Sequence, residues 1–237
     1  MSNDSADKLS LSLKTLVTRF IIVVIFGVAF GYIESAVVVY LREIFYPAGF
    51  TFPLPHAFDI NPLWKRLLLT ETGREAATLV LILSGAWLFG KNPRQRFAYS
   101  MIIFAAWDIF YYVWLKVILN WPASILDWDI LFLIPAPWAG PVLAPVLVSL
   151  TMLVFAWAIL YRDCINKPIK ASVWDWLGFS LAGLIVVLSF FLAGRFMTKP
   201  DFASHFSWPL FLTGLLAATG VFVKSFVAEC SPPRSPD

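Results

Sequence analysis

Six long apolar runs alternate with short polar stretches along the chain. A helix rises about 1.5 Å per residue, so about 20 apolar residues span the hydrocarbon core of a bilayer. The apolar positions do not alternate with a period of two, which argues against the strands of a membrane barrel. The pattern therefore predicts six transmembrane helices, at residues 16–41, 67–89, 97–119, 140–161, 174–196 and 207–227.

Composition supports this interpretation. Hydrophobic residues make up 59% of the 237 residues, charged residues only 14%, and the mean hydropathy is +0.77. A water-soluble surface could not accommodate that composition, so we expect an all-α integral membrane protein whose main partner is the lipid bilayer. The first apolar run has no small-residue cleavage pattern and is interpreted as a retained signal anchor. Residues 16–228 are expected to form one transmembrane domain, between an N-terminal tail (1–15) and a disordered tail (229–237).

The basic residues predict the orientation. Eleven of the 18 Lys and Arg residues fall on one side of the predicted spans, and the positive-inside rule assigns that side to the cytoplasm. We therefore expect a bacterial-type inner membrane protein with both chain ends in the cytoplasm and three longer, aromatic loops in the periplasm. The basic residues form no stripe interleaved with aromatic residues, so no nucleic-acid partner is expected.

The periplasmic stretch 120–145 contains three Trp and five Pro residues. Ser124 lies three residues ahead of Asp127, as in a helix N-cap, and the apolar run that follows is too short to span a membrane. This favours a short interfacial helix within 120–139. Its Trp residues are typical of the aromatic belt at headgroup depth, and a lid or substrate entrance that includes Trp128 and Trp138 is the alternative.

Four acidic residues lie within or at the edge of the predicted spans: Glu34, Glu71, Glu75 and Asp108. Each would cost about 2.5–3.5 kcal/mol near mid-bilayer without a partner. Spacings of four residues place Asp108, Tyr112 and Lys116 on one helix face, and Glu71, Arg74 and Glu75 share a sector of another helix. Three helices are therefore predicted to meet at a polar pocket that opens outward. The predicted catalytic residues are Glu34, Glu75, Asp108 and Tyr112, with Glu71, Arg74, Lys116, Asp127, Trp128 and Trp138 supporting.

Two other interpretations of these residues stay open. Arg74, Lys116 and Arg42 could pair with the carboxylates in a network that only locks the bundle. Alternatively, Glu34, Glu75 and Asp108, with His56 as a nitrogen ligand, could hold a hard divalent cation. The chain has only two His residues and no HExxH or ExxH motif, which argues against haem and zinc, so no cofactor is assigned.

Small residues predict close helix contacts at Gly27, Gly31 and Ser35 in the first span, and at Gly178 and Ala182 in the fifth. No internal repeat is evident, which counts modestly against an inverted-repeat carrier. The motifs GxSxG, GxGxxG and the P-loop are absent.

Three functions follow as hypotheses. The first is acid/base or cation-assisted chemistry on a lipid-like or small substrate, at a periplasm-facing site. The second is a proton- or cation-coupled carrier, in which buried carboxylates change protonation. The third is an accessory subunit of a larger membrane complex, with a membrane-protein partner or a second copy of the chain bound at the aromatic loops. Whether the chain is an enzyme is left undecided by the sequence.

Overall fold

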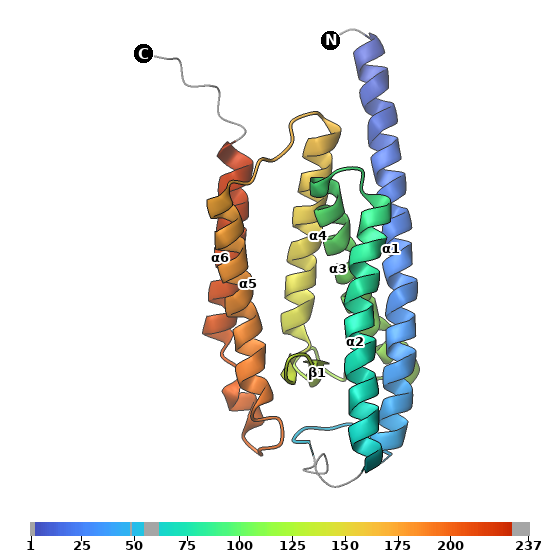
Figure 1. Cartoon of the computed structure of the whole chain (residues 1–237), viewed down its shortest axis with the longest axis vertical. Coiled ribbons are helices and arrows are strands. Elements are labelled where there is room, and N and C mark those ends of the chain that lie inside the picture. The colour runs from blue at the N-terminus through green and yellow to red at the C-terminus, as the bar shows by residue number, and fades with distance from the viewer. Residues whose placement is uncertain (1–2, 48, 55–61, 229–237) are drawn as a thin grey trace.

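The computed structural model describes residues 3–47, 49–54 and 62–228, with side chains at 11–47, 49–54 and 65–227. Six long helices run roughly parallel to one another (Figure 1). They are α1 (Asn3–Phe45), α2 (Pro62–Phe89), α3 (Pro93–Leu119), α4 (Leu143–Cys164), α5 (Val173–Gly194) and α6 (Trp208–Ala228). A two-stranded hairpin, β1 (Trp128–Phe132) and β2 (Trp138–Pro141), joins α3 to α4, and the 3-10 helix η2 (Phe202–His205) precedes α6.

Five of these helices are long and apolar enough to cross a membrane: Leu11–Phe45, Pro93–Leu119, Leu143–Cys164, Val173–Gly194 and Phe202–Val227. The chain is therefore a polytopic α-helical membrane protein. The remaining long helix, α2, is less apolar because Glu71, Arg74 and Glu75 interrupt its sequence. The predicted all-α fold is confirmed, and α2 differs from the other five predicted spans in carrying this polar segment.

Helix α3 lies at the centre of the larger group of helices, where it packs against α1, α2 and α4. Helices α5 and α6 form a pair that packs mainly within itself and against β2 (Figure 1). Both described chain ends lie at one end of the bundle, here called the terminal end, and β1 and β2 lie towards the other, here called the hairpin end (Figure 1).

Small residues of α1 allow a close helix contact, as predicted, and the partner helix is α3. A Cβ atom added to Gly27 would lie 2.6 Å from the Ala106 Cβ, and one added to Gly31 would lie 2.8 Å from the Trp107 carbonyl oxygen. Ser35 is fully buried and donates to the Tyr111 carbonyl oxygen at 3.0 Å. The two backbones can approach this closely only because these side chains are absent or small.

Small residues also allow the close contact between α5 and α6. A Cβ added to Gly178 would lie 3.0 Å from a Val221 methyl group, and Ala182 is buried. Gly214 of α6 completes this contact, because its added Cβ would lie 2.9 Å from the Ala182 carbonyl oxygen. The predicted packing role of the fifth span is thus also confirmed.

The predicted interfacial helix within 120–139 is wrong, because this stretch contains the β1–β2 hairpin. The strands pair antiparallel, with Asp129 opposite Gly140 and Ile130 opposite Ala139. Pro135 and Pro137 have no backbone N–H to donate within a helix, whereas the apolar and aromatic residues around them favour strands.

Asp127 does not support a helix N-terminus either. Its carboxylate accepts hydrogen bonds from the backbone N–H groups of Ala123 at 2.7 Å and Ser124 at 3.1 Å, and so closes a turn ahead of β1.

Candidate functional site

One cavity of about 1110 Å³ lies between α5–α6 and the other four helices, and all six helices contribute side chains to its lining. Its lining is apolar over most of its length. Along α3 the lining residues extend from Pro93 to Tyr112, a rise of about 28 Å at the usual helical pitch. The cavity therefore extends over roughly the thickness of a bilayer's hydrocarbon core.

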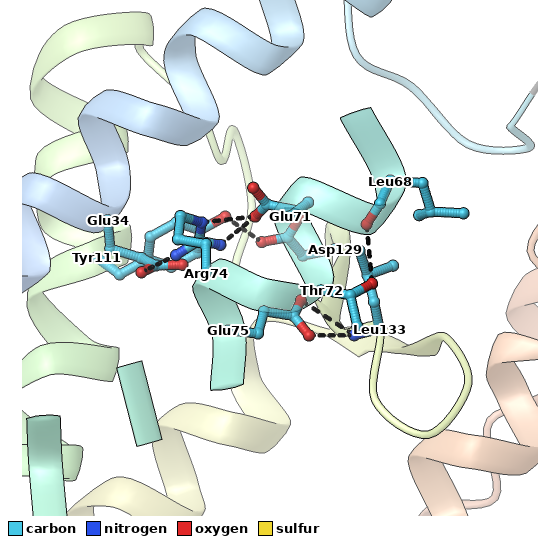
Figure 2. A network of polar contacts seen from close by, with 9 residues as sticks. All are labelled: Glu34, Leu68, Glu71, Thr72, Arg74, Glu75, Tyr111, Asp129 and Leu133. Atoms are coloured by element: carbon cyan, nitrogen blue, oxygen red, sulfur yellow. Dashed lines mark hydrogen bonds and ion pairs between the residues drawn. The ribbon is translucent and has the colours of Figure 1, made fainter. Parts of the chain in front are cut away.

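Polar groups gather at the part of the cavity nearer the hairpin end. Figure 2 shows Arg74 of α2 between two carboxylates, Glu34 of α1 and Glu71 of α2. The Arg74 guanidinium pairs with both, and its Nε donates to Glu71 Oε1 at 2.8 Å. Residues three apart lie on the same face of a helix, so Glu71 and Arg74, both on α2, can pair with each other. The predicted meeting of Glu34, Glu71 and Arg74 is observed.

Glu75 lies one helical turn beyond Glu71 but has a different partner. Both of its carboxylate oxygens accept the backbone N–H of Leu133, at 3.0 and 2.8 Å (Figure 2). Leu133 directly follows β1, so Glu75 joins α2 to the hairpin. Among the residues that the structure describes, no cation forms an ion pair with Glu75.

A second polar centre holds β1 against α1 and α3. Arg42 donates to Asp129 Oδ1 at 3.1 Å, and the Tyr111 hydroxyl donates to Asp129 Oδ2 at 3.0 Å. The Arg42 guanidinium also lies over two aromatic rings, 4.1 Å from the centroid of Phe50 and 3.8 Å from that of Trp121. Burial raises the pKa of Asp129, and the neighbouring Arg42 and Tyr111 act in the opposite direction.

Asp108 lies deeper in the cavity wall, at the contact between α3 and α4. Its Oδ2 accepts a hydrogen bond from the Ser149 hydroxyl at 2.8 Å, and both side chains are buried. Tyr112, one turn further along α3, is also buried and lines the cavity, with its ring against Tyr111 at 4.8 Å between centroids. Within the described parts of the chain, Asp108 has no cationic partner.

Several residues predicted to support the site lie elsewhere. Lys116 is exposed and donates to the carbonyl oxygens of Asn120 and Pro122, so it closes the end of α3 rather than contacting a carboxylate. Trp128 packs among aromatic rings at the hairpin end, including Phe202 at 5.0 Å. Trp138 does line the cavity, whereas Asp127 closes the turn before β1.

The metal hypothesis gains no support from the geometry. In the described part of the chain, no group of three or more His, Cys, Asp or Glu side chains is placed to hold a metal ion. Glu34 forms an ion pair with Arg74, and Glu75 accepts a hydrogen bond from the backbone N–H of Leu133. His56, the predicted nitrogen ligand, lies outside the described residues.

Sequence reasoning missed the roles of Asp129, Tyr111 and Ser149. Asp129 interrupts an apolar stretch, and that interruption was the available signal, because a charge there requires a partner. Arg42 at the end of the first span was the matching cation. Ser149 carries no comparable signal, since serine is frequent in membrane helices.

The charges that line the cavity are unevenly distributed. Five carboxyl groups and two guanidinium groups line it towards the hairpin end: Glu34, Glu71, Glu75, Asp108, Asp129, Arg42 and Arg74. Towards the terminal end it is lined by Arg94 and Lys170. Comparisons with known protein families, with characterised proteins and with solved structures found no match to this chain, so its function has to be inferred from the site itself.

Proposed function

We propose that this protein binds a membrane amphiphile in the cavity and carries out proton transfer on its polar end group, with Asp108 and Glu75 as the acid/base residues. The observation that carries the proposal is a long, mostly apolar cavity whose polar part includes two carboxyl groups, Asp108 and Glu75, that form no ion pair among the described residues. A carboxyl group in apolar surroundings needs a proton or a ligand group to offset its burial. Such groups are suited to general acid/base chemistry.

The other polar residues have positioning roles in this proposal. Arg74, Glu34 and Glu71 form a cluster of one cation and two carboxylates that fixes the polar wall of the cavity. Arg42 and Asp129 anchor β1, and Glu75 reaches the residue after it. The hairpin thereby closes the polar part of the cavity, while the apolar part accommodates the chain of the amphiphile.

We also propose that the membrane is a bacterial-type inner membrane, with the hairpin end on the periplasmic side. The basic loops at the terminal end support this orientation. A reporter enzyme that is active only outside the cytoplasm should be inactive when fused after Asp237. It should be active when fused after Lys199, in a chain truncated there. The opposite pattern would reverse the orientation.

Cavity occupancy can be tested by filling the cavity. Gly183 of α5 lines it, and a Cβ added there would meet no atom within 4 Å. We expect Gly183→Phe to remove most of the lipid that co-purifies with the wild type in mild detergent, as measured by mass spectrometry. Gly73→Phe is the matched control, since an added Cβ at Gly73 of α2 also meets no atom within 4 Å and this residue does not line the cavity.

The outcomes of this experiment separate the hypotheses. Bound lipid that is chemically altered over time by the wild-type protein in nanodiscs supports the enzyme. Lipid that is bound and moved across proteoliposomes in response to an ion gradient, without alteration, favours a carrier. Equal lipid content in wild type, Gly183→Phe and Gly73→Phe would contradict the proposal. The accessory structural subunit would then be the remaining hypothesis.

A further inference from the structure

We infer that the amphiphile is an uncharged lipid with a hydroxyl-bearing head group, such as a diacylglycerol, rather than an anionic phospholipid. This inference rests on the proposed function, because it specifies the ligand of the same cavity. Three features of the cavity carry it: the state of its guanidinium groups, the donors and acceptors in its wall, and the place of its remaining cations.

The first feature is that the guanidinium groups near the hairpin end already have anionic partners. Arg74 pairs with Glu34 and Glu71, and Arg42 pairs with Asp129. A phosphate placed here would meet five carboxyl groups and no uncommitted cation among the described lining residues. The ion-paired groups alone leave one negative charge in excess, because two guanidinium groups face the three carboxylates of Glu34, Glu71 and Asp129. Like charges brought together in a low-dielectric site repel strongly, so an anionic head group is disfavoured even when Asp108 and Glu75 carry protons.

The second feature is that the wall offers both acceptors and a donor. Asp108 and Glu75 present carboxyl oxygens, which accept hydrogen bonds. Trp107 lines the cavity with only 6% of its surface exposed, and its indole N–H is directed towards Glu34, whose carboxylate is already paired with Arg74. The wall therefore has an indole donor beside its carboxyl acceptors.

A hydroxyl group matches this wall because it donates to a carboxyl oxygen and accepts from an indole N–H at the same time. An ammonium group can only donate, and a phosphate ester without a hydroxyl group can only accept. A carboxyl residue can also exchange a proton with a hydroxyl group, so the group that the wall would recognise is one with which Asp108 or Glu75 can exchange a proton.

The third feature concerns the opposite end of the cavity, where an anionic lipid could bind in the reverse orientation. Arg94 there has a carboxylate partner, Asp163, at 3.4 Å, and Lys170 is exposed. The cations at this end are therefore a paired group and a surface group. Lys170 provides a control residue, because its removal tests the reverse orientation without touching the carboxyl groups.

The experiment uses full-length protein in detergent and a photoactivatable diacylglycerol. Unlabelled diacylglycerol, phosphatidylglycerol and a long-chain alkylamine are compared as competitors, and mass spectrometry locates the cross-link. We expect cross-links to residues that line the cavity. We expect diacylglycerol to compete at least about tenfold more effectively than phosphatidylglycerol, because the anionic head meets the excess of carboxyl groups. The alkylamine should compete less well than diacylglycerol.

Two variants test the cause of this selectivity. Glu71→Gln retains an amide oxygen that can accept the Arg74 Nε–H, and it removes the carboxylate that is in excess over the cations of the ion-paired groups. It should lower the preference for diacylglycerol over phosphatidylglycerol severalfold, whereas Lys170→Gln should leave the preference unchanged. A wild-type protein that prefers phosphatidylglycerol or the alkylamine would overturn the inference while the proposed amphiphile site stands. A failure of every lipid to compete would instead contradict the proposed function.

Discussion

Replacing Arg42 by glutamine is expected to lower the free energy of unfolding by about 3–5 kcal/mol, the usual cost of removing one partner from a buried ion pair. Arg42 and Asp129 have side chains that are only 8% and 3% exposed. Without the guanidinium, the Asp129 carboxylate keeps the Tyr111 hydroxyl and the Ile130 N–H as donors but loses its cation. The aromatic rings of Phe50 and Trp121 lose their cation–π contact with the guanidinium.

The measurement is unfolding of the purified protein in mixed micelles, followed by circular dichroism. Arg66→Gln provides the control, since Arg66 is an exposed residue of α2 outside the cavity. The double variant Arg42→Gln/Asp129→Asn should be more stable than the Arg42→Gln variant, because the uncompensated charge is gone. If Arg42→Gln unfolds like the wild type, the ion pair does not anchor the hairpin.

The helices could be predicted from the sequence because a membrane imposes a length and an apolar composition on each of them. A close helix contact on one face of α1 could also be predicted, since Gly27, Gly31 and Ser35 recur every four residues, but the structure was needed to show that α3 is the partner. The β1–β2 hairpin could not be predicted from the sequence. Its pairing brings residues 128–132 against 138–141, and a short apolar stretch with Trp and Pro is equally typical of an interfacial segment.

The candidate site was predictable where it depends on helical spacing. Glu71 and Arg74 are three residues apart on α2. Glu34 lies within a span and therefore needs a cationic partner at a similar depth, which Arg74 provides. The Glu75 contact was not predictable, because its partner is the backbone N–H of Leu133 and no side-chain pattern marks it. Lys116 was misplaced for a related reason: a long side chain near a helix end can turn to the free carbonyl groups there.

Asp108 is the residue whose replacement should affect activity most. Asp108→Asn retains an oxygen that can accept the Ser149 hydroxyl proton, so the contact between α3 and α4 persists, but the amide can no longer exchange a proton with a ligand. If Asp108 is an acid/base residue of the proposed reaction, conversion of the bound lipid should fall by about 10²–10⁴-fold, the range that general acid/base catalysis contributes. Lipid turnover in nanodiscs, quantified by mass spectrometry, measures this effect.

Two controls separate a chemical role for Asp108 from a structural one. Asp201→Asn removes an exposed carboxylate that lies outside the cavity and pairs with the nearby His205 side chain, so it should turn over lipid like the wild type. Ser149→Ala removes the hydroxyl that orients Asp108 and should reduce turnover less than Asp108→Asn does, because the carboxyl group remains. Asp108→Asn protein that binds lipid and converts it at the wild-type rate would exclude proton transfer by Asp108. Loss of both lipid binding and folding in this variant would instead make Asp108 a residue that stabilises the α3–α4 contact through Ser149.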